Sequence, residues 1–167
     1  MFPPNTLALA LAFFSLAAAA YADNIHKMKR TAKAYKERQV GNYFTSISDT
    51  CENKKLPEIN LNIPPAGGTV CMRPGMGTLH NVWSGKLQHC IGKKMFGALV
   101  MYRPFGNFTG LDTMQYTVGV GVEPWQSRTY EVEITVEAGE APPPAASSAP
   151  PEPQKAGPMP ECPPLVS

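Results

Sequence analysis

Two segments in which apolar and polar residues alternate lie in the second half of the chain, between Leu99 and Val136. The first reads LVMYRPFGNFTGLDTMQYTV, and the second, RTYEVEITV, follows after a short gap rich in turn-forming residues. A period of two around a cluster of Gly, Pro, Asn and Asp predicts antiparallel strands that each bury one face. We expect the inward residues to be Met114, Tyr116 and Val118 on one strand and Tyr130, Val132, Ile134 and Val136 on the next.

Shorter runs of the same kind extend this pattern toward the N-terminus. The predicted strands are Tyr43–Ser48, Glu58–Ile63, Thr69–Arg73, Ala98–Arg103, Thr113–Val120 and Arg128–Val136. Gly75 to Lys94 has no clear period, and we expect a long loop there, with a short strand at Leu79–Trp83 as the alternative. Many short strands at this spacing predict an all-β fold, an antiparallel β-sandwich over residues 42–137.

The N-terminus has the pattern of an export signal. Residues Leu7 to Ala20 are almost entirely apolar, but this run is shorter than the roughly 20 residues that span a bilayer. Ala20-Tyr21-Ala22 then places small residues where a signal peptidase cleaves. The preceding MFPPNT lacks Lys and Arg, which departs from the usual pattern, and a short buried helix is the alternative. We predict a signal peptide over residues 1–22 and a bacterial protein that is periplasmic or secreted.

A basic segment follows, over residues 23–41. Six Lys and Arg residues lie between Lys27 and Arg38 against one acid, Glu37. Its apolar residues have loosely helical spacing, so the segment is interpreted as a basic arm that is either helical or solvated. Residues 24–40 are a candidate for weak contact with anionic membrane or an acidic envelope polymer. The net charge of the whole chain is only +2, which gives no argument for nucleic-acid binding.

The last segment, residues 138–167, is rich in proline and alanine. Proline cannot donate to a β-ladder, and the segment has little apolar mass for a core. We therefore predict a disordered tail that serves as a spacer, with docking of its Pro-rich motifs into an aromatic groove as the alternative.

The chain has four cysteines, Cys51, Cys71, Cys90 and Cys162, an even number that predicts disulfides in an exported protein. Cys51 and Cys90 each precede a predicted strand and could join two strand entries, which leaves Cys71 for Cys162. The alternative pair, Cys71–Cys90, would close the irregular loop, and the sequence does not choose between them. Neither CxxC nor HxxxH spacing occurs near His80, His89 and Cys90, so we expect no metal site and no cofactor.

The segment from Val100 to Val118, with its Tyr-x-Pro and Phe-x-Gly-x-Asp-like motifs, and Val132–Val136 resemble bacterial Ig-like and cadherin-like repeats. Pro65-Ala-Gly-Gly-Thr-Val70 is similar to the hairpin that opens these modules. The resemblance covers about half of the chain after the signal peptide and implies a single copy of an Ig-like sandwich. It implies turn roles for Pro104, which ends a strand, for Gly110, and for Asp112, which accepts backbone N–H groups.

No constellation in the sequence indicates an enzyme. There is no Gly-x-Ser-x-Gly motif and no glycine-rich phosphate loop before a helix, and His89 and Cys90 would point to opposite faces of a strand. We therefore expect a non-enzymatic module that binds or supports a protein or glycan of the cell envelope. Its candidate contact residues are Trp83, His80, His89 and Lys86. The alternative function is surface association through residues 24–40, with the β-domain as carrier.

Overall fold

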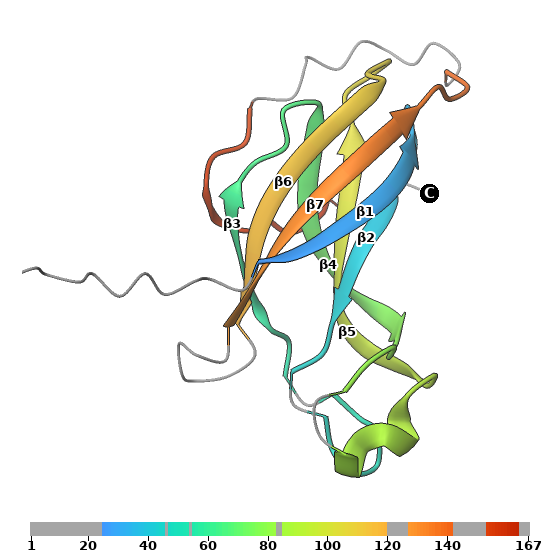
Figure 1. Ribbon diagram of the computed structural model, residues 1–167, viewed down its shortest axis with the longest axis vertical. Helices are drawn as coiled ribbons and strands as arrows, with labels where there is room; N and C mark the ends of the chain where they lie inside the picture. The colour runs from blue at the N-terminus through green and yellow to red at the C-terminus, as the bar shows by residue number, and fades with distance from the viewer. Residues whose placement is uncertain are drawn as a thin grey trace, which may run out of the picture.

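The computed structural model describes residues 25–45, 47–53, 55–82, 85–119, 127–141 and 153–163. Within them the chain forms two β-sheets packed face to face (Figure 1), which confirms the predicted β-sandwich. One sheet has the order β1-β7-β6-β3-β8 and the other the order β2-β5-β4. The strands are β1 (His26–Lys33), β2 (Arg38–Tyr43), β3 (Glu58–Ile63), β4 (Gly68–Thr78), β5 (Lys94–Pro104), β6 (Gly110–Gly119), β7 (Ser127–Glu137) and β8 (Gly157–Pro158). The predicted signal peptide, residues 1–22, lies outside the described residues.

The main core lies between the two sheets and follows the predicted alternation. Every second side chain of β6 and β7 points inward, because neighbouring residues on a strand face opposite sides. The inward residues Met114, Tyr116, Val118, Val132, Ile134 and Val136 are buried as predicted, and Tyr130 packs against them. The facing sheet contributes Val40, Val70, Ala98, Val100 and Tyr102.

The predicted basic arm, residues 23–41, is wrong as a separate and helical segment. Its first part is β1, which pairs in parallel with β7 from His26↔Tyr130 to Lys33↔Glu137. Its second part is β2, which pairs with β5 in the other sheet. Ala32 and Ala34 are buried in the main core, so a set of small apolar side chains holds the segment against the sandwich. The loosely helical spacing was misleading, because the segment makes a turn between two strands.

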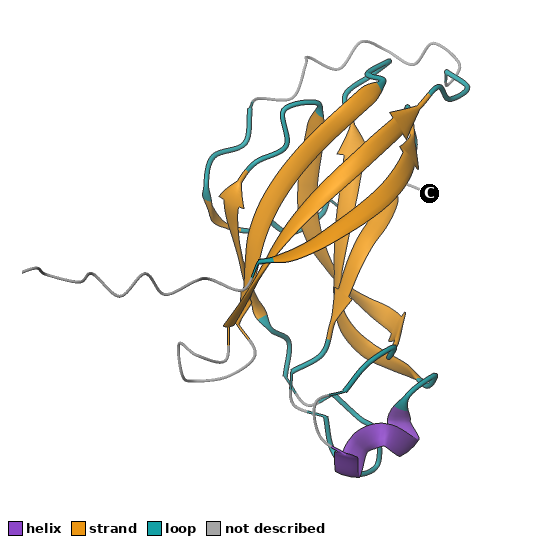
Figure 2. Ribbon diagram, in the orientation of Figure 1, coloured by secondary structure: helices purple, strands orange, loops and turns teal. Residues whose placement is uncertain are grey.

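The strands β2 and β4 differ from their predicted bounds. β2 ends at Tyr43, where the predicted strand Tyr43–Ser48 begins, and its pairing with β5 contains a bulge at Gln39/Gly41. β4 continues through Thr78 and β5 begins at Lys94, so the hairpin extends well into the expected loop. A 3-10 helix, η1 (Gly85–Cys90), follows, and no strand forms over the described residues 79–82 (Figure 2).

The C-terminal segment departs from the predicted disordered tail. Residues 153–163 lie against the sandwich, where β8 pairs with β3, Met159 enters the main core and Cys162 bonds to Cys71. We call residues 153–163 the strap. The expectation failed here because backbone pairing and a disulfide fix a segment that has little apolar mass of its own. The middle of the predicted tail, residues 142–152, lies outside the described residues.

Candidate functional site

Two disulfides join parts of the chain that are distant in sequence. Cys51 pairs with Cys90 and Cys71 with Cys162, with Cα–Cα distances of 5.4 and 4.9 Å. The pairing in which Cys51 and Cys90 join two strand entries is therefore confirmed, and the alternative Cys71–Cys90 pair is wrong. Two disulfides are compatible with an oxidising, extracellular environment.

The Cys51–Cys90 disulfide closes a small lobe beyond the end of the sandwich. We call the described residues of 44–53 and 79–93, which exclude 46, 83 and 84, the distal lobe. η1 lies at its tip, where the β4–β5 hairpin extends past the other strands (Figure 2). The lobe has its own core of Cys51, Leu79, Cys90 and Met95, with Phe44, Ile47, Val82 and Leu87 packed against it. The lobe therefore places the residues of the expected loop on a closed framework.

Three of the four predicted contact residues fall in this lobe. His80, Lys86 and His89 are all exposed, with Lys86 and His89 on η1, whereas Trp83 lies outside the described residues. The His89 ring is fixed, because its Nε2 lies 2.9 Å from the carbonyl oxygen of Asp49 and 3.5 Å from the Cys90 sulfur. Neither of these groups is a nucleophile that a histidine could activate.

Cys51, His89 and Cys90 bring three potential metal-ligating atoms to within 4.8 Å of one another. Thiolate is the form of cysteine that binds a metal, and both sulfurs are committed to the disulfide. The cluster therefore offers one nitrogen ligand in the oxidised protein, too few for a tetrahedral zinc site.

The hairpin also presents an apolar pair that the sequence interpretation did not single out. Met76 and Phe96 are opposite one another in the β4–β5 ladder and are 59% and 50% exposed. They continue the row of Val70 and Met72, whose side chains face the main core, but they lie beyond it. Their neighbour Met95 points the other way, into the lobe core. The adjacent Met95 and Phe96 could have predicted an exposed apolar side chain, since adjacent residues on a strand cannot both face one core.

The predicted turn residues have structural roles, but Asp112 acts on a different turn from the expected one. Its carboxylate accepts the N–H groups of Ala66 and Gly67, each at 3.0 Å, from the connection between β3 and β4. It also accepts the Tyr102 hydroxyl at 2.7 Å and the N–H of Thr113 at 2.9 Å. A side chain at position 67 would collide with the Phe108 ring, which explains the glycine beside this carboxylate.

The other two predicted turn residues lie at strand ends. Pro104 is the last residue of β5 and pairs with Gly68, and the N–H of the following Phe105 still donates to the Gly67 carbonyl at 2.8 Å. Gly110 begins β6 at φ +116°, a conformation that side-chain-bearing residues rarely adopt. Both positions shape the backbone between β5 and β6.

Four tyrosines inside the sandwich have altered ionisation. The hydroxyls of Tyr43 and Tyr116 are 2.6 Å apart, and the Tyr130 ring packs beside both. Burial raises the pKa of all three phenols above the ordinary value. Burial and the hydrogen bond to Asp112 also raise the pKa of Tyr102. These phenols therefore stay neutral at pH 7, where they act as hydrogen-bonding core residues.

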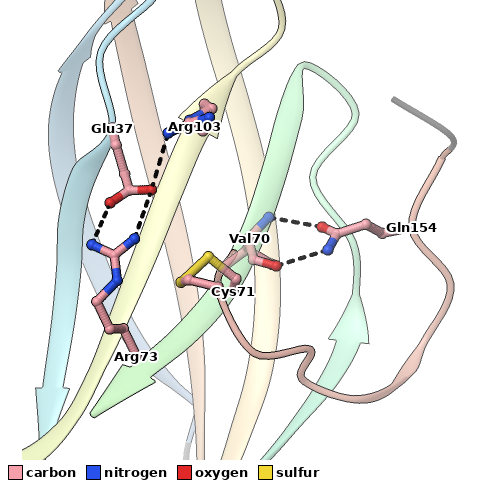
Figure 3. The surroundings of a disulfide bond; sticks show 7 residues. Glu37, Val70, Cys71, Arg73, Arg103 and Gln154 are labelled. Atoms are coloured by element: carbon pink, nitrogen blue, oxygen red, sulfur yellow. Dashed lines mark hydrogen bonds and ion pairs between the residues drawn. A yellow bond between two sulfur atoms is a disulfide. The ribbon is translucent and has the colours of Figure 1, made fainter. Parts of the chain in front are cut away.

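The charges of the basic segment are partly matched by acids of the sandwich. Lys27 and Lys29 lie 3.3 and 3.2 Å from Glu131 and Glu133 on the neighbouring strand. Glu37, the one acid between Lys27 and Arg38, binds Arg73 at 2.8 Å and Arg103 at 3.5 Å (Figure 3). Two of the basic side chains thus have carboxylate partners within the described residues.

Searches against protein-family models, curated proteins and solved structures found no significant match to this chain. Among the helices of the described residues, none has the length and apolar character needed to cross a membrane. Inferences about function therefore rest on the residues and contacts described above.

Proposed function

We propose that this protein is an exported, non-enzymatic Ig-like module of the bacterial envelope that binds another protein through the end of its β4–β5 hairpin. The observation that carries the proposal is the exposed Met76–Phe96 pair beside the distal lobe. Methionine and aromatic residues are enriched at the centres of protein interfaces, where their burial supplies much of the binding energy.

A basic side chain beside this pair favours a partner with acidic groups. Lys94 is exposed two residues from Phe96, on the same face of β5. An apolar centre with a basic side chain at its rim is complementary to an apolar patch that carries carboxylates at its edge. A protein surface fits this description better than an uncharged glycan.

The Ig-like assignment is supported by the strand order. In such sandwiches the second, fifth and fourth strands are neighbours in one sheet, and the third, sixth and seventh strands form the other. The sheets β2-β5-β4 and β7-β6-β3 have that arrangement, whereas β1 pairs with β7 and not with β2. The export signal and the two disulfides support a periplasmic or secreted location.

A photo-crosslinking amino acid at position 96 tests the contact surface in the host cell. We expect one discrete crosslinked product in the envelope fraction, and its loss on substituting Met76→Ser. The matched control is the same probe at Leu111, which is 60% exposed on β6. Equal products from both positions, or no product from position 96, would contradict the proposal.

The alternative proposal, membrane or polymer association through residues 24–40, has less support. Lys27 and Lys29 already face Glu131 and Glu133, and β1 and β2 belong to the two sheets. Co-sedimentation with anionic vesicles at physiological salt measures it, with neutral vesicles as the control. Binding that is lost in a Lys33→Gln/Lys36→Gln variant would favour this alternative.

A further inference from the structure

The strap crosses from one sheet of the sandwich to the other. β3 lies at the edge of its sheet apart from the two-residue β8, and β4 is the edge strand of the second sheet. The strap makes backbone contacts with both, so it covers the side of the sandwich where the two edges face each other. Figure 3 shows this path, with Gln154 at one end and the disulfide of Cys71 at the other.

On β4 the strap forms hydrogen bonds with the outward-facing backbone N–H and C=O groups of two alternate residues. The side-chain amide of Gln154 accepts the N–H of Val70 and donates to its carbonyl oxygen, both at 2.7 Å. The N–H of Met72 donates to the Pro160 carbonyl at 2.8 Å, and the Cys162 N–H donates to the Met72 carbonyl at 2.9 Å. These four bonds are the ones that an added strand would make at an open edge.

On β3 the strap adds two paired residues and one buried side chain. Gly157 and Pro158 pair with Leu61 and Asn60, and the Met159 N–H donates to the Ile59 carbonyl at 2.8 Å. The Met159 side chain is 7% exposed and belongs to the main core. The strap thus combines edge pairing with one side-chain pocket, the two elements by which proteins bind extended peptides.

Proline residues limit the backbone pairing that is available along β4 and along the outer side of the strap. Pro74 is the next residue of β4 whose backbone faces outward after Val70 and Met72, and it has no N–H to offer. Pro158 and Pro160 likewise give the strap no donors at alternate positions, so the strap does not present a full ladder to a further strand. Pairing is therefore confined to the short stretch that the strap covers.

We propose that the β3–β4 edge is a binding surface for an extended peptide of a partner protein, and that the strap is its built-in occupant. The matching peptide has a long unbranched apolar side chain at the position of Met159 and pairs through its backbone with Met72 and Ile59. This surface is distinct from the Met76–Phe96 contact, and the inference does not depend on it.

The Cys71–Cys162 disulfide is the latch that keeps the strap in place. Both of its cysteines are partly exposed, whereas Cys51 and Cys90 are buried. A thiolate of a dithiol reductant attacks one cysteine sulfur, which forms a mixed disulfide and releases the other cysteine as a thiolate. The second thiol of the reductant then attacks the reductant sulfur of the mixed disulfide and releases the remaining cysteine. The protein gains two electrons and two protons, and the reductant becomes a disulfide. Because access of the attacking thiolate affects this rate, Cys71–Cys162 should be reduced before Cys51–Cys90.

The test compares the full-length mature chain with a strap-released variant, Cys71→Ser/Cys162→Ser/Met159→Asp. The probe is a fluorescein-labelled synthetic peptide of residues 153–163 that carries Cys162→Ser, and fluorescence anisotropy measures its binding. We expect at least tenfold tighter binding to the released variant than to the oxidised wild type. Adding Met72→Pro to the released variant removes the N–H that donates to the Pro160 carbonyl, and it should abolish the gain in peptide affinity.

Equal binding to both proteins, or none to a released variant whose circular dichroism is native, would overturn the proposal. Analytical sedimentation of the released variant measures whether it dimerises. A dimer that excess peptide does not dissociate would show that the surface serves a second copy of this chain, and would also overturn the proposal.

Amide hydrogen exchange on the wild-type protein tests release of the strap without relying on a variant that could fail to fold. Mild dithiol treatment that reduces only Cys71–Cys162 should raise exchange at Met72, Met159 and Cys162 by tenfold or more, with β6 and β7 unchanged. Unchanged protection at these amides after that reduction would show that the strap is not released, which contradicts the latch.

Discussion

At the scale of single residues, Asp112 connects three parts of the sandwich. Its carboxylate, 4% exposed, accepts hydrogen bonds from the β3–β4 connection, from Tyr102 on β5 and from the following residue on β6. A buried carboxylate is tolerated only when its oxygens are satisfied, and here each oxygen accepts two donors. These contacts give the residue a role in stabilising the fold.

We expect Asp112→Asn to lower the free energy of unfolding by about 2–4 kcal/mol, because an amide NH₂ would then face backbone N–H donors. Urea unfolding followed by circular dichroism measures the change. Tyr102→Phe is the control, since it removes one donor and should cost about 1 kcal/mol. A loss for Asp112→Asn no larger than that for Tyr102→Phe would show that the backbone donors contribute little.

The buried tyrosines predict a loss of stability in alkali. The pKa values of Tyr43, Tyr102, Tyr116 and Tyr130 are raised in the folded chain, so the unfolded chain loses these protons first. Their contribution is complete below the ordinary tyrosine pKa of about 10 and is lost as the pH rises above it. Each tyrosine contributes a slope of about 1.4 kcal/mol per pH unit in that range.

Absorbance at 295 nm and circular dichroism, followed together from pH 8 to 12.5, measure this effect. We expect most of the tyrosinate signal to appear together with unfolding. The Tyr43→Phe variant should show a shallower dependence of stability on pH. Full ionisation with the fold intact would contradict the burial of these phenols.

At the scale of secondary-structure elements, β1 is part of the sandwich and not an appendage. It pairs with β7 over eight residues and buries Ala32. Its two ion pairs with β7 join exposed side chains, and such pairs contribute little to stability. Its backbone pairing and apolar side chains therefore hold it in place.

We expect deletion of residues 24–33 to lower the free energy of unfolding by on the order of 3 kcal/mol or more, because the edge of β7 and part of the core become exposed. The charge control, Lys27→Gln/Lys29→Gln, should change it by less than about 1 kcal/mol. Thermal unfolding of the three proteins measures both values. A deletion as mild as the charge variant would restore the interpretation of this segment as an arm.

At the scale of the whole molecule, the chain has two cores of unequal size. The main core fills the sandwich, whereas the described residues of the distal lobe form a cluster with four buried members, Cys51, Leu79, Cys90 and Met95. A core this small needs a covalent constraint, and the Cys51–Cys90 disulfide closes a loop with a sequence separation of 39. On the chain-entropy estimate such a loop contributes about 4 kcal/mol.

We expect Cys51→Ala/Cys90→Ala to unfold the distal lobe locally. Amide hydrogen exchange should rise by at least tenfold over residues 85–93, while β6 and β7 keep their protection. The Cys71→Ala/Cys162→Ala variant is the matched control and should raise exchange in the strap instead. Lost protection in β6 and β7 of the first variant would mean that lobe and sandwich unfold as one unit.

Local patterning in the sequence determined the fold class and its clearest strands. The period of two in β6 and β7 indicates which residues face inward, and β3 matches its predicted bounds. Pro104 and Gly110 act on the backbone close to themselves, so their roles could be predicted from residue type. The sequence left two disulfide pairings open, because the choice between them depends on distances between separate strands.

Only the tertiary structure decided the partners of segments that lack a clear period. The basic segment became β1 because β7 offered an edge, and the strap became ordered because β3 and β4 offered theirs. Every residue except proline carries the same backbone N–H and C=O groups, so pairing with a strand edge leaves little trace in the sequence of the segment that pairs. The exposure of Met76 and Phe96 has the same origin, since their strands continue past the facing sheet that covers Val70 and Val100.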